Sequence, residues 1–351
     1  MGPSVFEHPL LGGHFRDPDM AAILTPERQM MHMLNFEAAW LRACGKVGLF
    51  EMLQAEEAAS AIERATVDFA DIGLGMAVDG VPIPSLVKQL KAITSVDEVH
   101  RGATSQDVVD TAMVLALKEA TNLIVSRLTE ASTLLGELDE HFGRAPLMGR
   151  TRMQAATEIT VSDRLAAWHL PLLEHLARLQ QVRSRVERVQ IGGAAGDRKA
   201  LGDKGDAVVA DVACALGLLP TQKAWHAMRD GIAEYASLLS LVTGTLGKIG
   251  QDVALMAQQG IDEIGLSDGG SSSAMPHKQN PVSAELLVTL ARFNAVQVSA
   301  MHHAMLHEQE RSGASWTLEW MVLPQMLMAT GRSLSVAIKL FQNVTRIGWT
   351  G

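Results

Sequence analysis

The sequence is poor in aromatic residues, which account for 4% of its 351 residues. β-Sandwiches and β-barrels depend on aromatic and β-branched side chains, so this scarcity, combined with abundant Ala, Leu and Met, favours an all-α fold. Cysteine is also scarce, since Cys44 and Cys214 are the only two. Two cysteines exclude a disulfide framework, and we expect both to be buried apolar side chains in a reducing compartment.

Long apolar runs and an excess of positive charge are missing as well. No uninterrupted apolar run is long enough to cross a bilayer, and the N-terminus lacks the charged head and apolar run of a signal peptide. The formal net charge of −9 argues against nucleic acid as a partner, because nucleic acid requires a basic face. We therefore expect a soluble cytoplasmic protein with neither a membrane nor nucleic acid as its partner.

What the sequence does contain is a series of helical patterns. Thr25-Pro26-Glu27 is typical of a helix start, and shorter helical patterns follow, so residues 1–97 are expected to form an N-terminal helical domain. Five longer helices, predicted within residues 98–342, run from about Ser105 to His141, Ala155 to Gln190, Arg229 to Gln259, Val282 to Glu310 and Trp316 to Gln342. Such helices are expected to form an antiparallel bundle that also packs against other copies of the chain. Residues 343–351 remain as a short C-terminal tail.

Three loops beside these helices carry polar residues. Residues 100–107, His-Arg-Gly-Ala-Thr-Ser-Gln-Asp, open the first long helix, whose N-terminus offers hydroxyls and free amides to an anion. Residues 148–155, Met-Gly-Arg-Thr-Arg-Met-Gln-Ala, are expected at the start of the second. Residues 267–281 are rich in Gly, Ser and Pro and contain Lys278, which indicates either a lid over an anionic substrate or a plain polar connection. Another glycine-rich loop, residues 192–196, is interpreted as tight backbone packing or a turn. A dinucleotide-binding fingerprint is disfavoured there, because no strand precedes it.

Together the three loops resemble the signature regions of the fumarase/aspartase superfamily. The motifs are His-x-Gly-Ala-Thr-Ser-x-Asp, Gly-Arg-Thr-x-x-Gln-x-Ala and Gly-x-Ser-Ser-x-Met-Pro-x-Lys-x-Asn-Pro, and the similarity covers essentially the whole chain. Within the superfamily the sequence is most similar to bacterial 3-carboxy-cis,cis-muconate cycloisomerases, through residues 36–43, 225–230 and 275–282. The resemblance implies chemistry without cofactor or metal, in a homotetramer whose active sites each combine the three regions from three subunits.

The reaction implied by the resemblance is intramolecular lyase chemistry, the conversion of 3-carboxy-cis,cis-muconate to 4-carboxymuconolactone in the protocatechuate branch (β-ketoadipate pathway) of aromatic degradation. Ser272 matches the catalytic position and would protonate the carbanion that forms when a carboxylate adds to a double bond. The positions that match polycarboxylate-binding residues are Thr104, Ser105, Thr151, Arg152, Gln154, Ser273, Lys278 and Asn280. His100, Glu285 and Arg311 match supporting positions, although His100 and Arg311 fit a core or surface role equally well.

The second region departs from the superfamily at Arg152, where its lyases usually carry a histidine that assists a poor leaving group. A lactone opens to a carboxylate, which leaves as a stable anion because its pKa is about 4. A fixed cation at Arg152 would complement that charge, so the departure favours a cycloisomerase over a fumarase or aspartase. Glu285 matches the usual partner of the missing histidine. We therefore predict an Arg152–Glu285 ion pair across a subunit boundary, the alternative being a solvated Glu285.

Other functions compete with this one. A sulfonate-bearing muconate is a close alternative substrate, and a β-elimination lyase of the adenylosuccinate or argininosuccinate type is the alternative reaction. A non-catalytic structural relative is disfavoured because Ser272, Lys278 and Asn280 occur together. Superfamily chains usually carry a sizeable C-terminal helical domain. Since this sequence stops at Gly351 soon after the fifth long helix, we expect that domain to be reduced or absent.

Overall fold

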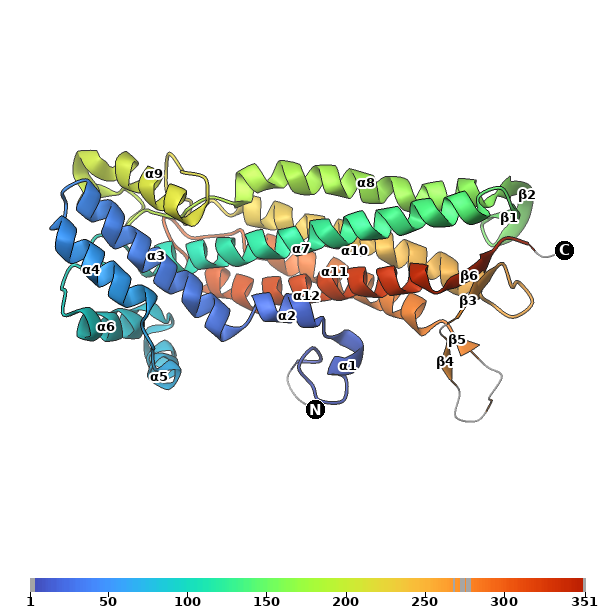
Figure 1. Ribbon diagram of the computed structural model, residues 1–351, viewed down its shortest axis with the longest axis horizontal. Helices are drawn as coiled ribbons and strands as arrows, with labels where there is room; N and C mark the ends of the chain where they lie inside the picture. Colours follow the sequence, from blue (N-terminus) through green and yellow to red (C-terminus); the bar gives the residue numbers. More distant parts are fainter. Residues whose placement is uncertain (1–3, 268, 272–274, 276–278, 350–351) are drawn as a thin grey trace.

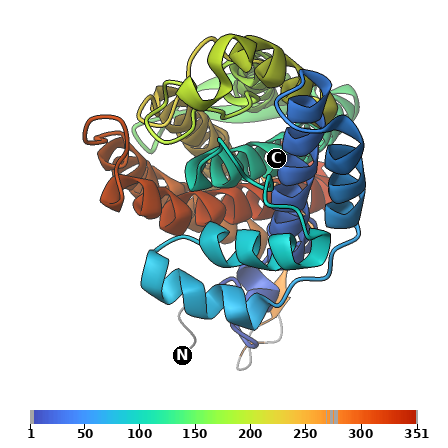
Figure 2. The same ribbon diagram turned by 90° about the vertical axis from the view of Figure 1, so that its left-hand side faces the viewer.

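The computed structural model of the protein describes residues 4–267, 269–271, 275 and 279–349. Its N-terminal part is a set of helices, namely α1 (Gly12–Phe15), α2 (Pro18–Ile23), α3 (Pro26–Lys46), α4 (Met52–Glu63), α5 (Phe69–Asp79) and α6 (Ile83–Thr94). Helix α3 begins where the sequence predicts, because the Thr25 side chain accepts from the N–H of Arg28 and Pro26 occupies the first turn. In Figure 2, α3 to α6 lie at one end of the long helices.

Five long helices run side by side along the molecule (Figure 1), namely α7 (Ser105–Phe142), α8 (Val161–Val186), α10 (Asp230–Met256), α11 (Val282–His303) and α12 (Ala314–Gln342). Between α8 and α10 lie the 3₁₀ helix η1 (Lys199–Lys204) and α9 (Gly205–Leu216). The predicted all-α fold class is therefore confirmed. The predicted bounds of the second long helix were wrong, because it runs from Val161 to Val186 instead of Ala155 to Gln190. The fourth ends at His303, before the predicted Glu310. Pro171 and Pro324 lie inside α8 and α12, respectively.

Small antiparallel strand pairs gather at the opposite end of the molecule from α3 to α6 (Figure 1). The pairs are β1 (Pro146–Thr151) with β2 (Gln154–Thr160), β3 (Ile264–Leu266) with β6 (Val344–Ile347), and β4 (Gly270–Ser271) with β5 (Gln279–Asn280). One backbone bond joins two of these pairs, because the N–H of Trp349, just after β6, donates to the carbonyl of Pro146 in β1 at 2.9 Å. The N–H of Gly348 donates to the carbonyl of Glu263 at 2.9 Å and extends the β3–β6 pair. The β1–β2 and β3–β6 pairs are thus held together at this end of the bundle.

The core is a continuous set of buried apolar side chains within and between the helices. Glycines bring α10 and α11 close together: a Cβ added at Gly247 would lie 2.4 Å from the Cβ of Ala291, and one at Gly250 would lie 2.5 Å from the carbonyl oxygen of Ala284. Only glycine leaves room for so short a separation between the two backbones. The tight α10–α11 contact therefore depends on sequence positions that carry no side chain.

Two expectations from composition can be compared with this structure. Cys44 is buried as expected, and its burial raises the thiol pKa to about 12. Cys214 is exposed, so its predicted burial was wrong. Within the described part of the chain, none of the helices combines the length and apolar character that crossing a membrane requires.

Candidate active site

The first signature region forms the start of α7, as the sequence predicts. Thr104 is the N-cap residue, and its backbone N–H donates to the Asp107 carboxylate at 3.1 Å, as in a capping box. Thr104 and Ser105 are both partly exposed. Their hydroxyls therefore lie at an accessible helix N-terminus, where the helix dipole favours a negatively charged group.

Asp107 ties this helix start to the glycine-rich loop at residues 192–196. Its two carboxylate oxygens accept from the N–H of Gly192 at 2.8 Å and of Gly193 at 3.0 Å, and one of them also contacts His226 Nε2 at 2.8 Å. A Cβ at Gly192 would lie 2.7 Å from the His226 ring, so glycine is required for this approach. The interpretation of these glycines as a site of tight backbone packing is confirmed.

One turn further along α7, Asp110 belongs to a buried charge cluster with Arg229 and Glu319. The Arg229 guanidinium donates to Asp110 at 2.6 Å and to Glu319 at 2.9 Å, and the Trp316 indole N–H donates to Asp110 at 2.9 Å. Burial acts to lower the pKa of Arg229, but the two carboxylates outweigh it and the pKa is raised. Burial also raises the pKa of Glu319. The cluster fixes α12 and the residues before α10 to the first turns of α7.

His100 precedes this helix and adopts a left-handed backbone with φ of 64°. Its Nδ1 lies 2.6 Å from the carboxylate of Glu37, a buried residue of α3. Burial lowers the pKa of His100, but attraction and hydrogen bonding by Glu37 outweigh burial, so the pKa lies above its ordinary value. Nearby, Arg311 donates to the carbonyls of Gly193 at 3.3 Å and Ala194 at 3.1 Å, from the loop between α11 and α12.

The second signature region is a β-hairpin rather than the helix start that we expected. Thr151 pairs with Gln154, leaving Arg152 and Met153 at the tip with positive φ values of 51° and 68°. The helix is delayed to Val161 because Thr160 caps it, exchanging hydrogen bonds with Asp163 at 2.9 and 3.2 Å. Thr151, Arg152 and Gln154 are all exposed on this hairpin.

Part of the third signature region lies close to the same end of the bundle. Asn280 is partly buried on β5, paired with Gly270, and Glu285 is exposed in the first turn of α11. Ser272, Ser273 and Lys278 lie outside the described residues, so the proton-transfer and lysine assignments stay predictions. In the second region, Arg150 forms an ion pair with the buried Glu263, close to the start of β3.

The structure separates the predicted site residues into two groups at opposite ends of the bundle (Figure 1). His100, Thr104, Ser105 and Arg311 lie near the start of α7, whereas Thr151, Arg152, Gln154, Asn280 and Glu285 lie near its far end. Helix α7 has 38 residues, so its ends are about 57 Å apart at 1.5 Å per residue. Among the described residues, one chain therefore does not bring the three regions together. The predicted Arg152–Glu285 ion pair, as a contact between copies, stays a prediction.

Sequence reasoning missed the residues that support the first region, namely Glu37, Asp107, Asp110 and Glu319. Asp107 could have been found, because an acid three residues after a threonine N-cap is the signature of a capping box. A charged residue within an otherwise apolar stripe, as Glu37 is in α3, was a weaker signal. Gly192 and Arg229 lie in segments that the sequence singled out, residues 192–196 and 225–230, but nothing indicated their partners, since only the folded chain brings them to α7.

The chain is similar in sequence to known lyases and cycloisomerases. A family model described as lyase matches residues 18–296. The 3-carboxy-cis,cis-muconate cycloisomerase of Pseudomonas aeruginosa is 35% identical over 345 residues, which are 95% of this chain and 75% of that protein. The N-acetyl-S-(2-succino)cysteine lyase of Enterococcus italicus is 34% identical, over 96% of this chain and 75% of that protein. The similar proteins therefore include enzymes with different substrates.

Solved structures show the same similarity. The 3-carboxy-cis,cis-muconate lactonizing enzyme from Pseudomonas putida superposes with a TM-score of 0.89 and 34% identity, covering 96% of this chain and 77% of that one. The likeness thus extends over nearly the whole described bundle together with its N-terminal helices.

Proposed function

This chain belongs to the lyase family of fumarase and aspartase, and from that premise we propose that it is a cofactor-independent intramolecular lyase. Its substrate would be 3-carboxy-cis,cis-muconate and its product 4-carboxymuconolactone. This reaction adds one carboxylate of the substrate to its own double bond, so atoms are rearranged and nothing leaves. A protein with this activity would act in the degradation of aromatic compounds through protocatechuate.

The observation that carries the proposal is Arg152 at the exposed tip of the β1–β2 hairpin. A guanidinium remains protonated at any physiological pH, so it cannot deliver a proton to a leaving amine or alcohol. In lactonisation the attacking group is a carboxylate, and in the reverse reaction the leaving group is the same carboxylate. A carboxylate needs a nearby positive charge and not a proton donor. The cation at this position thus suits a cycloisomerase better than a lyase that expels a basic group.

The remaining roles follow from the chemistry of the matched positions. Ser272 would transfer the proton at the carbon next to a carboxylate, with Lys278 and Asn280 stabilising the negative charge that develops on that carboxylate. Thr104, Ser105, Thr151, Gln154 and Ser273 would hold the other carboxylates. Because those of these residues that the structure describes lie at both ends of α7, we propose that two or more copies of the chain, in a homotetramer, combine to form each site.

A second candidate is β-elimination of a thiol from an N-acetyl-S-(2-succino)cysteine, favoured by the 34% identity to a lyase with that name. A thiol has a pKa of about 8.5, between that of a carboxylic acid and that of an amine, so it also departs with limited help from an acid. This reaction differs from cycloisomerisation because it releases two products.

The test is to supply the purified protein with each substrate in turn. Loss of the conjugated-diene absorbance of carboxymuconate, with a single lactone product, is the expected result, and Ser272→Ala should remove it. Turnover of N-acetyl-S-(2-succino)cysteine alone would replace the first candidate by the second. Full activity in Ser272→Ala would contradict the role of that serine.

A further inference from the structure

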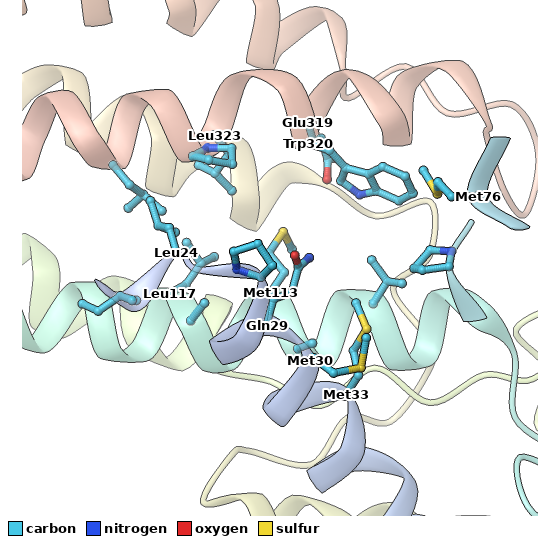
Figure 3. A pocket seen from close by; sticks show the side chains of 18 of the residues that line it. Leu24, Gln29, Met30, Met33, Met76, Met113, Leu117, Glu319, Trp320 and Leu323 are labelled. Carbon is cyan, nitrogen blue, oxygen red and sulfur yellow. The ribbon is translucent and has the colours of Figure 1, made fainter. Parts of the chain in front are cut away.

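A cavity of about 400 Å³ opens between the N-terminal helices and the pair α7 and α12. Figure 3 shows its walls, with Leu24, Met30 and Met33 on one side and Trp320 and Leu323 of α12 on another. Helix α5 contributes Met76, and Pro82, just before α6, lies at a further wall. Its volume lies within the range of about 300–1,000 Å³ typical of small-molecule sites.

The lining is almost entirely apolar and unusually rich in methionine. Met30, Met33, Met76 and Met113 contribute flexible thioethers, which adapt to ligands of different shape. Neither lysine, arginine nor histidine occurs among the described residues that line it. The only charged group is Glu319, whose carboxylate is already held by Arg229. A carboxylate would therefore find no cation among these lining residues.

The cavity lies along the face of α7 that begins at the expected carboxylate-binding end. Val109, Ala112 and Ala116 line it, and Ser105 precedes Val109 by four residues. Positions 105, 109, 112 and 116 share one helix face, and four residues of helix advance by about 6 Å. The apolar wall thus starts roughly one turn beyond the hydroxyl of Ser105.

We propose that this cavity is a subsite for an uncharged apolar substituent of a polycarboxylate substrate. This inference rests on the proposed function, because it places the carboxylates at Thr104 and Ser105. The substituent would then extend along α7 between Met113 and Trp320. Carboxymuconate carries a charged carboxylate on each branch and has no apolar end to place there. The subsite would therefore let the enzyme accept, besides carboxymuconate, muconate-like or succinyl-type polycarboxylates that bear an alkyl or aryl group.

Binding of two related ligands tests this directly by isothermal titration calorimetry. Succinate supplies the carboxylates alone, and benzylsuccinate adds a phenyl ring through one methylene. Burying an aromatic side chain of this size favours binding enough to make benzylsuccinate about 10- to 100-fold tighter than succinate. Equal affinity, or no measurable binding of benzylsuccinate, would overturn the proposal.

Filling the cavity provides the matched control. Ala116→Phe should abolish the preference for benzylsuccinate and leave the affinity for succinate unchanged. Ser126→Phe adds a large side chain at an exposed position of the same helix and should keep the preference. Ala112→Leu fills the same wall more conservatively and serves if Ala116→Phe does not fold. A preference that persists in both filled variants would contradict the assignment.

Two further outcomes have a defined meaning. If Ala116→Phe changes the molar mass measured by light scattering, a second copy of the chain occupies the cavity and the subsite assignment is wrong. If the wild-type protein prefers benzylsuccinate yet does not convert carboxymuconate, the apolar subsite stands and only the proposed substrate fails.

Discussion

His100 combines two unusual properties, a left-handed backbone and a buried carboxylate against its ring. Left-handed conformations cost non-glycine residues free energy, and they are concentrated at functional sites. The Glu37 carboxylate lies 2.6 Å from Nδ1 of His100 and so keeps a proton on that nitrogen. The other ring nitrogen, Nε2, is then left to contact other groups. Glu37 is thus a positioning residue for a histidine beside the expected anion site.

Replacing Glu37 by glutamine should lower the pKa of His100, because the carboxylate is what raises it above its ordinary value. NMR titration of the imidazole should show the midpoint moving to lower pH, whereas Glu37→Asp should keep part of the shift. Below pH 6.5 His100 is charged in both the folded and the unfolded state, and there the Glu37–His100 pair contributes its full stabilisation to the fold. This stabilisation is lost as pH rises through the pKa of His100 in the folded state. The loss of unfolding free energy in Glu37→Gln, about 1–3 kcal/mol, should therefore be largest at acidic pH. An unchanged titration midpoint of His100 in Glu37→Gln would contradict the role given to Glu37.

At the hairpin tip, the left-handed residues Arg152 and Met153 offer a matched pair of substitutions. Glycine at either position relieves backbone strain. Arg152→Gly should therefore leave stability unchanged or raise it, yet lower kcat/KM about 10- to 100-fold through the loss of one charge-assisted contact. Met153→Gly relieves the same strain and keeps the cation, so it should retain activity. Equal activity of both variants would remove Arg152 from the site.

At the scale of elements, helix positions were predictable and the second signature region was not. The α3 start at Thr25 and the α7 start at Thr104 follow from local capping residues, which a sequence displays directly. The β1–β2 hairpin has Arg-Met at its turn in place of the usual Asn-Gly, so its turn signal is absent from the sequence. The buried partners Arg229 and Glu319 come from distant segments, and periodicity does not identify which distant charges meet.

The glycines of α10 provide a test of how closely two elements approach. Gly247→Ala would place a Cβ 2.4 Å from that of Ala291, so α10 and α11 must separate, at a cost of about 1–3 kcal/mol of unfolding free energy. Gly244→Ala lies in the same helix with nothing within 4 Å of the added Cβ, and should stabilise by about 0.5–1 kcal/mol. Chemical denaturation measures both. Equal changes of unfolding free energy in Gly247→Ala and Gly244→Ala would show that the distance between α10 and α11 does not depend on the missing side chain at Gly247.

At the scale of the whole molecule, the separation of the two residue groups along α7 makes a prediction about mixtures. Two variants are each expected to be inactive, Thr104→Ala combined with Ser105→Ala at one end, and Ser272→Ala in the third region. Co-expression in equal amounts should restore activity at roughly a quarter of the sites, because a site that combines two copies can receive both intact halves. Activity no greater than the sum of the separate variants would show that each chain forms its own site.

The length of α7 has a consequence for how this protein can change over evolutionary time. If the residue groups at the two ends of α7 must meet their counterparts in other copies, the length of this 38-residue helix sets the distance between the two groups in every copy. An inserted turn would shift one of the two groups by about 5.4 Å and misalign all the sites together. An insertion in the loops that join the helices is absorbed locally. Length variation among relatives should therefore accumulate in the connections and leave the long helices constant.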